Sequence, residues 1–222
     1  MIARKQTIVS AVFTFAVFLF GLAPAAHANL MVNGSFEIDN FGPSHKLGLV
    51  GNDVTGWFIP SLDGVYPWGL QNVNIFGGGP AADGNQWLVL GEVSTGVEYT
   101  IQQTLNGLVP GSIYNLSFAL ASESGCCSTA EVSFLSGSST APQSFVAPSS
   151  GQWWTQWGAY SMNFLADVSS VTLQFKNINL GPGIDLGLDN VIVEGASIPE
   201  PATLALMGLG LAGIGFRRKL QA

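Results

Sequence analysis

The chain of 222 residues contains few charged residues, which make up 9% of its sequence, compared with about 25% in average soluble domains. It also has few cysteines and histidines, two of each, and 7 basic residues against 14 acidic ones. A net charge of −7 argues against nucleic-acid binding, because neutralising phosphates requires the opposite balance. A hydrophobic content of 47% argues against intrinsic disorder.

The basic residues gather at the two ends of the chain. Five of the seven lie within the first five or the last six positions. Residues 29–197 therefore hold thirteen acidic and two basic residues, which gives this central segment a net charge of −11. Such a segment suits neutral ligands better than polyanions.

Residues 1–28 show the three-part pattern of a secretory signal peptide. Basic residues precede an uninterrupted apolar stretch, and the segment ends with Ala26 and Ala28 at the −3 and −1 positions of a cleavage site. This pattern predicts an N-terminal signal helix that is removed by cleavage before Asn29. A buried amphipathic helix would need a polar face, which residues 12–22 lack.

The last 25 residues contain a second apolar segment. Residues 202–216 are uncharged, and they are flanked by six residues that complete the pattern: Pro199, Glu200, Pro201, Arg217, Arg218 and Lys219. As a helix the segment would span only about 22 Å of a hydrocarbon core about 30 Å thick. We expect a transmembrane helix that anchors the chain transiently, with the basic cluster in the cytoplasm and the acidic domain outside.

The order of Pro-Glu-Pro, apolar segment and basic tail resembles the PEP-CTERM sorting signal of bacterial surface proteins. The resemblance implies recognition by an exosortase-type membrane protease-transpeptidase. It also implies cleavage near Pro-Glu-Pro and release or transfer to the cell surface, usually in species that make exopolysaccharide. The alternative is a plain C-terminal anchor with a chance Pro-Glu-Pro.

Residues 29–197 show no convincing amphipathic helix; short alternating segments separated by turn residues predict an all-β domain instead. The clearest are residues 97–105 and 114–120, on either side of the turn Val109-Pro110-Gly111. Eight or nine antiparallel strands suggest a jelly-roll β-sandwich. The further candidate strands are residues 30–36, 73–76, 86–90, 130–135, 154–164, 171–175 and 188–193.

This domain resembles the galactose-binding-like jelly rolls found in many extracellular carbohydrate-binding modules. The resemblance rests on residues 30–37, Thr55-Gly56-Trp57, residues 83–88, 100–118 and 188–191. In such domains an early Glu and an Asp on the last strand commonly help to bind Ca²⁺, and the matching residues here are Glu37 and Asp189. The resemblance thus implies a structural Ca²⁺, with a solvated Glu and a turn-facing Asp as the alternative; no other cofactor is expected.

The central segment contains few candidate catalytic residues. The only histidine of the central segment, His45, lies in a loop rich in Gly, Pro and Ser. Any nucleophile-base pair would therefore have to use this surface loop residue, and a metal site would have no second histidine. The acidic residues mostly lie beside turns, so they do not by themselves indicate a glycosidase. Residues 77–80, Gly-Gly-Gly-Pro, lack the Lys and the helix of a phosphate-binding loop. The sequence therefore predicts a non-catalytic protein.

The adjacent cysteines Cys126 and Cys127 lie in a loop between two predicted strands. Export would place them in an oxidising compartment, where thiols tend to pair. We favour a strained vicinal disulfide between them. Linkage to another chain or to a small thiol, and two unpaired residues, remain alternatives.

Residues 152–164 are rich in tryptophan and carry the candidate ligand site. If this segment is one strand, Trp154, Tyr160, Met162 and Phe164 face the core. Trp153 and Trp157 then lie with Ser161 and Asn163 on the outer face, where exposed indoles beside polar side chains suit the binding of a sugar ring. The alternative is that one indole packs under a loop or in the core; Trp57, Trp68 and Trp87 are expected to be core or loop residues.

Together these features predict an exported bacterial surface or matrix protein that binds extracellular polysaccharide without catalysis. Its other expected partners are an exosortase-type enzyme and, before processing, the membrane. A purely structural surface or biofilm protein that contacts other proteins is the alternative, and a secreted glycosidase is a third.

Overall fold

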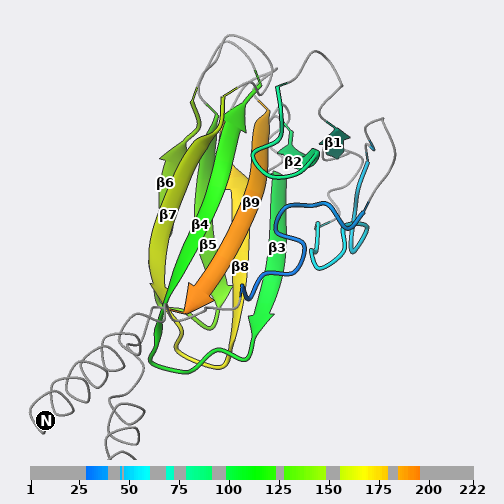
Figure 1. Cartoon of the computed structure of the whole chain (residues 1–222). Coiled ribbons are helices and arrows are strands. Elements are labelled where there is room, and N and C mark those ends of the chain that lie inside the picture. The colour runs from blue at the N-terminus through cyan, green and yellow to red at the C-terminus, as the bar shows by residue number, and fades with distance from the viewer. Residues whose placement is uncertain are drawn as a thin grey trace, which may run out of the picture. The chain divides into compact units, whose positions relative to one another are not determined.

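A computed structural model of the chain describes residues 29–39, 46, 48–60, 69–72, 79–91, 99–123, 128–148, 156–179 and 185–195. These residues belong to one unit, Ala28–Ala196. They form nine antiparallel strands in two sheets and no helix (Figure 1). The predicted all-β jelly-roll sandwich is therefore confirmed, whereas the predicted terminal helices lie outside the described residues.

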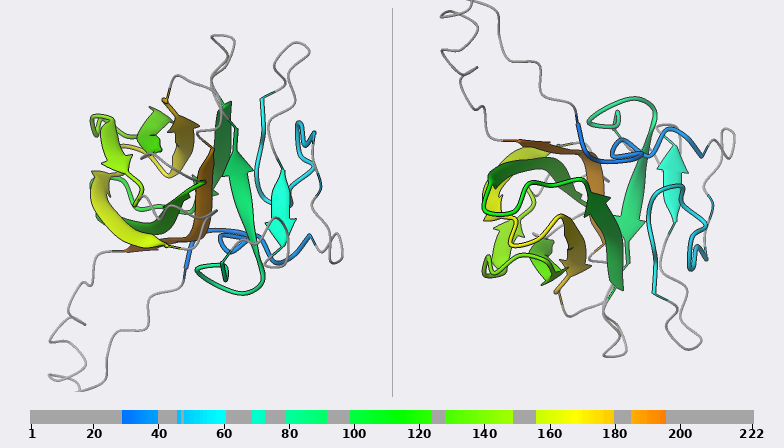
Figure 2. Two further views of the ribbon diagram at one scale, coloured as in Figure 1. Left: turned by 90° about the horizontal axis from the view of Figure 1, so that it is seen from above. Right: turned by 90° about the horizontal axis from the view of Figure 1, so that it is seen from below.

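The two sheets contain five and four strands. The five-stranded sheet has the order β1 (Leu70–Asn72), β2 (Gln86–Leu90), β9 (Leu186–Gly195), β4 (Ile113–Ser122) and β7 (Gly158–Leu165). The four-stranded sheet has the order β3 (Tyr99–Asn106), β8 (Ser170–Asn177), β5 (Thr129–Ser136) and β6 (Gln143–Val146). Figure 2 views this arrangement from above and from below.

Alternation of apolar and polar residues places one face of each strand in the core. In β3, Tyr99, Ile101 and Leu105 are buried and alternate with more exposed residues, as the period-two pattern predicts. The turn after β3 leads to β4 in the other sheet, and Gly111 within it has a φ of 80°, a conformation that glycine adopts without steric cost.

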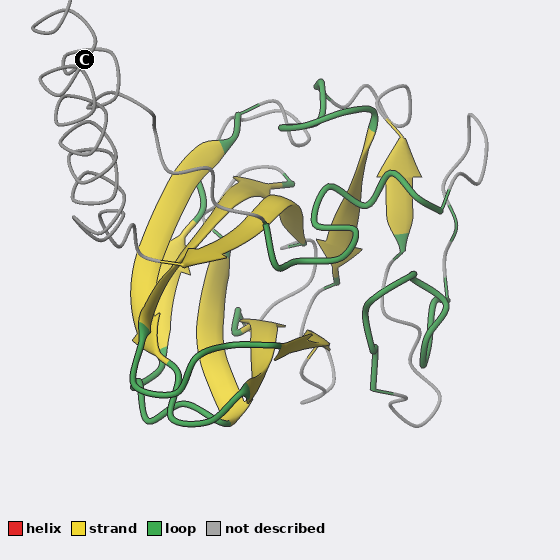
Figure 3. Ribbon diagram, turned by 60° about the horizontal axis from the view of Figure 1, so that its bottom comes forward, coloured by secondary structure: helices red, strands yellow, loops and turns green. Residues whose placement is uncertain are grey.

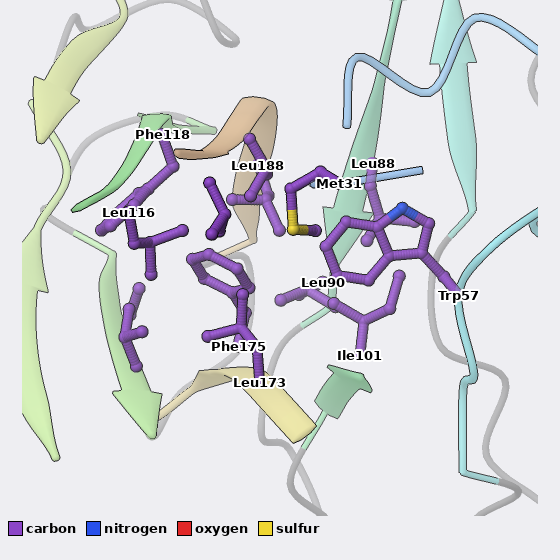
Figure 4. Close-up of a cluster of buried hydrophobic side chains, with 14 of the residues drawn as sticks. Met31, Trp57, Leu88, Leu90, Ile101, Leu116, Phe118, Leu173, Phe175 and Leu188 are labelled. Atoms are coloured by element: carbon purple, nitrogen blue, oxygen red, sulfur yellow. The ribbon is translucent and has the colours of Figure 1, made fainter. Parts of the chain in front are cut away.

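The core between the sheets is largely aliphatic and is completed by aromatic rings. Figure 4 shows Phe118 and Leu188 of the five-stranded sheet close to Phe175 of the other sheet, with Trp57 at one side. The Trp57 ring lies 5.5 Å from that of Phe36 and 6.4 Å from that of Phe175. Trp57 is thus a core residue, as expected, and its N–H donates to the Asn33 carbonyl at 3.0 Å, which ties the segment around Asn33 to the sandwich.

The strand predicted at residues 30–36 does not form. Asn33 and Phe36 have positive φ angles of 54° and 59°, which turn the backbone and bring Phe36 into the core. The segment is held instead by the buried side chain of Gln103, which accepts the Val32 N–H and donates to the Val32 carbonyl. Three further differences concern strand positions: β1 and β6 were not predicted, and β7 begins at Gly158.

A bulge in β9 joins this first segment to the five-stranded sheet. The register with β4 shifts between Ser117 and Ala119, and Asn190 has a φ of 49°. The Val191 N–H then donates to the Gly34 carbonyl at 2.9 Å. A Cβ at position 34 would lie 1.9 Å from the Val191 carbonyl oxygen, so only glycine fits this close approach.

Candidate functional site

Four polar side chains project from the outer face of the five-stranded sheet, which is the face turned away from the core. Asn115 and Ser117 come from β4, and Asn163 and Ser161 are their direct cross-strand partners on β7. The Asn115 amide donates to the Asn163 carbonyl oxygen at 3.0 Å. We call these four residues the polar face; together they offer amide and hydroxyl groups to the solvent.

Trp157 lies immediately before β7 and packs on this same outer face. Its ring meets the edge of the buried Trp87 ring at a centroid distance of 6.0 Å and an angle of 77°. Trp87 belongs to a small apolar cluster with Val89 and Ala121, against which Trp157 packs. Since Leu88 and Leu90 of the same strand point into the main core, Trp87 and Val89 must point outward.

The indole of Trp157 is therefore partly buried. Its N–H donates to the Pro80 carbonyl at 2.8 Å, which fixes the orientation of the ring. The predicted grouping of Trp157 with Ser161 and Asn163 on one face agrees with this arrangement, although Trp157 precedes the strand. Trp153, the second predicted contact, lies outside the described residues, and whether either residue binds a ligand stays a prediction.

The two predicted Ca²⁺ ligands hold the same turn, residues 83–86. Glu37 accepts the N–H groups of Asn85 and Gln86, both at 2.7 Å, on one carboxylate oxygen. Asp189 accepts the Asp83 N–H at 2.9 Å and the Asn190 N–H at 2.7 Å. The two carboxylates thus hold the turn between the N-terminal segment and β9.

Glycine at position 84 is required for this turn. Its φ is 71°, and a Cβ there would lie 2.5 Å from the carboxyl carbon of Glu37. A side chain at this position would therefore push Glu37 away from the N–H groups that it accepts. The Asp83-Gly84-Asn85 sequence indicates a turn, but it does not indicate that a carboxylate more than forty residues away packs against it.

Asp189 is fully buried, and burial raises the pKa of its carboxyl group to about 7. The backbone N–H groups that it accepts oppose this effect, and the nearby charge of Asp83 adds to it. Burial dominates because a charged carboxylate loses most of its hydration there. The charge of this carboxyl group is therefore sensitive to pH near neutrality.

The backbone N–H groups that Glu37 and Asp189 accept are relevant to the predicted Ca²⁺ site, because they occupy carboxylate oxygens that would bind the ion. Ca²⁺ needs six to eight oxygen ligands, whereas the partners of Glu37 and Asp189 shown here are backbone N–H groups. Among the residues described, no group of three or more His, Cys, Asp or Glu could hold a metal ion. The contacts fit carboxylates that hold a turn better than a metal centre, and the Ca²⁺ site stays a prediction.

Several predicted features lie outside the described residues. They are His45, Trp68, the candidate strand 73–76, residues 77 and 78, the cysteines Cys126 and Cys127, Trp154, the signal-cleavage residues Ala26 and Ala28, and the sorting-signal residues Pro199, Glu200, Pro201, Arg217, Arg218 and Lys219. Within the part of the chain that the structure covers, no helix is long and apolar enough to cross a membrane.

The sequence pattern does not single out Asn115 or Ser117 as site residues. It places both only on the polar side of the strand predicted at residues 114–120, because periodicity does not show which strands pair. The signal that could have found them is the matching order of polar residues in two segments, Asn115 and Ser117 in one and Ser161 and Asn163 in the other. Antiparallel pairing then brings equal residue types side by side.

The fold and these surfaces define a jelly-roll domain with a polar outer face bordered by a tryptophan. The chain belongs to the family described as "Protein of unknown function (DUF642)", which it matches over residues 29–193. Residues 197–219 match the PEP-CTERM protein-sorting motif, which confirms that resemblance and implies export to the cell surface. A search of curated proteins found no significant match.

Solved structures share the fold at low sequence identity. The Stig cyclase Fisc from Fischerella sp. TAU, 12% identical, superposes with a TM-score of 0.56 over 77% of this chain and 98% of that one. TmCBM61 in complex with β-1,4-galactotriose gives 0.45 at 14% identity, covering 76% and 99%. A family 16 carbohydrate-binding module gives 0.42 at 18% identity, covering 74% and 99%. At these identities the likeness concerns the fold alone.

Proposed function

We propose that this protein is processed by an exosortase-type enzyme and binds an uncharged extracellular polysaccharide, without catalysis, through the polar face and Trp157. The observation that carries the proposal is the common face of Asn115, Asn163 and the oriented indole. Amide and hydroxyl groups can donate to and accept from sugar hydroxyls, and an aromatic ring covers the apolar side of a sugar. The PEP-CTERM motif supports an extracellular location.

The charges around the polar face favour an uncharged ligand. Glu194 is the cross-strand neighbour of Asn115 on β9, so a carboxylate borders the face. Of the two basic residues in the described domain, Lys176 lies on the other sheet, 4.0 Å from Glu131. An acidic polysaccharide would therefore meet repulsion at this face, because like charges brought close together cost free energy.

Two double variants test the polar face with matched changes. Asn115→Ala with Asn163→Ala removes one hydrogen-bonded pair from the five-stranded sheet. Thr104→Ala with Thr172→Ala removes an exposed cross-strand pair, whose hydroxyl oxygens lie 3.1 Å apart, from the four-stranded sheet. Retention of the protein on immobilised neutral polysaccharides should fall about tenfold or more for the Asn pair and should not change for the Thr pair.

Equal retention of both double variants and the native protein would contradict the proposed site. If both double variants lose polysaccharide binding to the same extent, the polar face is not a specific binding site. Thermal unfolding of each variant checks that the domain is folded. Trp157→Ala is a less clean probe, because the indole also packs on Trp87 and donates to Pro80.

A further inference from the structure

One end of the sandwich carries four exposed aliphatic side chains. They are Val109, Ile113, Leu165 and Val168, with exposed fractions of 60%, 52%, 36% and 50%. Ile113 is the first residue of β4, Leu165 is the last residue of β7, and the two are direct cross-strand partners. Val109 and Val168 lie in the turns that follow β3 and β7, at the lower end of the domain in Figure 1, which comes forward in Figure 3. We call these four residues the apolar end.

Backbone hydrogen bonds join the two turns of the apolar end. Gly111 N–H donates to the Ala166 carbonyl at 2.7 Å, Ala166 N–H to the Ser112 carbonyl at 3.0 Å, and Leu108 N–H to the Ser169 carbonyl at 3.1 Å. The turns that carry Val109 and Val168 are therefore joined to each other, beside the Ile113–Leu165 pair. Exposed apolar side chains that gather at one end of a domain favour an interaction surface.

The last strand of the domain ends beside this surface. Gly195, the last residue of β9, pairs with Tyr114, which follows Ile113 directly. The uncharged segment begins at residue 202, so the intervening chain can extend at most about 25 Å. The first residues of the domain lie here as well, since Leu30 donates to the Val193 carbonyl at 2.8 Å. The first and last described residues of the domain therefore lie at this end of the sandwich.

We propose that the apolar end rests on the outer surface of the lipid bilayer while residues 202–216 hold the chain in the membrane. The proposal rests on the membrane-anchored stage of the proposed function. Insertion of aliphatic side chains into the interfacial region removes apolar surface from water. A short tether keeps the local lipid concentration high, so weak intrinsic affinity is enough.

The chemistry of the apolar end favours uncharged lipid over an anionic surface. Neither described basic residue belongs to it, whereas Asp167 lies next to Val168 and Glu194 lies beside Asn115, close to Ile113. Attraction by anionic headgroups requires lysine or arginine. The contact is therefore apolar, and it should survive high salt, because screening weakens only charge interactions.

The test uses the full chain in phosphatidylcholine vesicles. Val109→Asp with Val168→Asp places charges on the apolar end. Val32→Asp with Ile38→Asp is the matched control, because those side chains are 51% and 61% exposed on the N-terminal segment. Hydrogen exchange of the backbone amides in residues 107–112 and 165–170 should be at least about threefold faster in the first variant than in the native chain, and unchanged in the control.

Each outcome decides the proposal. Equal exchange in the native chain and in Val109→Asp/Val168→Asp would overturn it, as would the same acceleration in the control. A native chain that does not float with the vesicles would show that the membrane anchor itself fails. Exchange in β8 reports whether each variant is folded, and a loss of polysaccharide retention would not bear on this end, because the polar face is tested separately.

Discussion

Asp189 provides the sharpest test of how the turn at residues 83–86 is held. Its carboxyl group is fully buried on β9 and accepts the N–H groups of Asp83 and Asn190. Burial raises its pKa from 3.8 to about 7, so between these pH values the folded protein binds a proton that the unfolded chain has released. The free energy of unfolding should therefore fall as the pH rises through this window.

The size of the effect follows from the shift. A change of one pKa unit corresponds to about 1.4 kcal/mol, so a shift of about three units gives up to about 4 kcal/mol. This contribution of Asp189 to stability is fully present below pH 4 and is lost above pH 7. It is a large fraction of the 5–15 kcal/mol typical of a folded domain.

The assay compares the native protein with Asp189→Asn. Urea unfolding followed by tryptophan fluorescence at pH 4 to 8 gives the two free energies, and their difference isolates the titration of Asp189 from that of the other carboxylates. The native protein should lose up to about 4 kcal/mol relative to the variant across this range. Asp167→Asn removes a charge from an exposed turn and serves as the matched control.

A difference between native protein and Asp189→Asn that does not change with pH would refute this reasoning. Ca²⁺ gives a second arm of the same experiment. If the ion binds Glu37 and Asp189, its addition at pH 7 raises the unfolding midpoint of the native protein and a chelator reverses the gain. No effect of either would contradict the Ca²⁺ prediction and leave the carboxylates as ligands of backbone N–H groups only.

Three further changes have defined outcomes. Gly84→Ala should cost about 1–3 kcal/mol in urea unfolding, because its φ is positive and its Cβ would meet Glu37. Trp157→Ala should also lower the free energy of unfolding, by about 1–3 kcal/mol, through loss of the contact with Trp87 and of the indole hydrogen bond; an unchanged midpoint would contradict either prediction. Intact mass without reductant should show the cysteine pair 126–127 two hydrogens lighter than two free thiols, and a mass with both thiols free would rule out the vicinal disulfide.

The sequence predicted those parts of the fold that depend on local pattern. The alternation in β3 and β4 follows from each strand having one buried face, and the turn at Pro110-Gly111 follows from its residue types. The path of residues 30–36 could not be predicted in this way. Asn33 and Phe36 adopt left-handed conformations because Trp57 and Gln103 hold the segment from elsewhere in the chain.

The candidate site was predictable in part for the same reason. Ser161 and Asn163 could be assigned to an outer face from the period of β7 alone. The pairing of Asn163 with Asn115 depends on the register between two strands about fifty residues apart, which local periodicity does not contain. The orientation of Trp157 depends on a carbonyl 77 residues away. Long-range contacts therefore decide what this face offers to a ligand.

The two proposed surfaces share the strand β7. β7 begins next to Trp157 and ends at Leu165 of the apolar end, and its eight residues extend about 26 Å. In the proposed membrane-bound arrangement, the polar side chains of β7 lie between the bilayer surface and Trp157. The indole is then the part of the site farthest from the lipid, and the Asn115–Asn163 pair, next to Ile113 and Leu165, is the part nearest to it. Release by an exosortase should therefore favour binding that uses both parts.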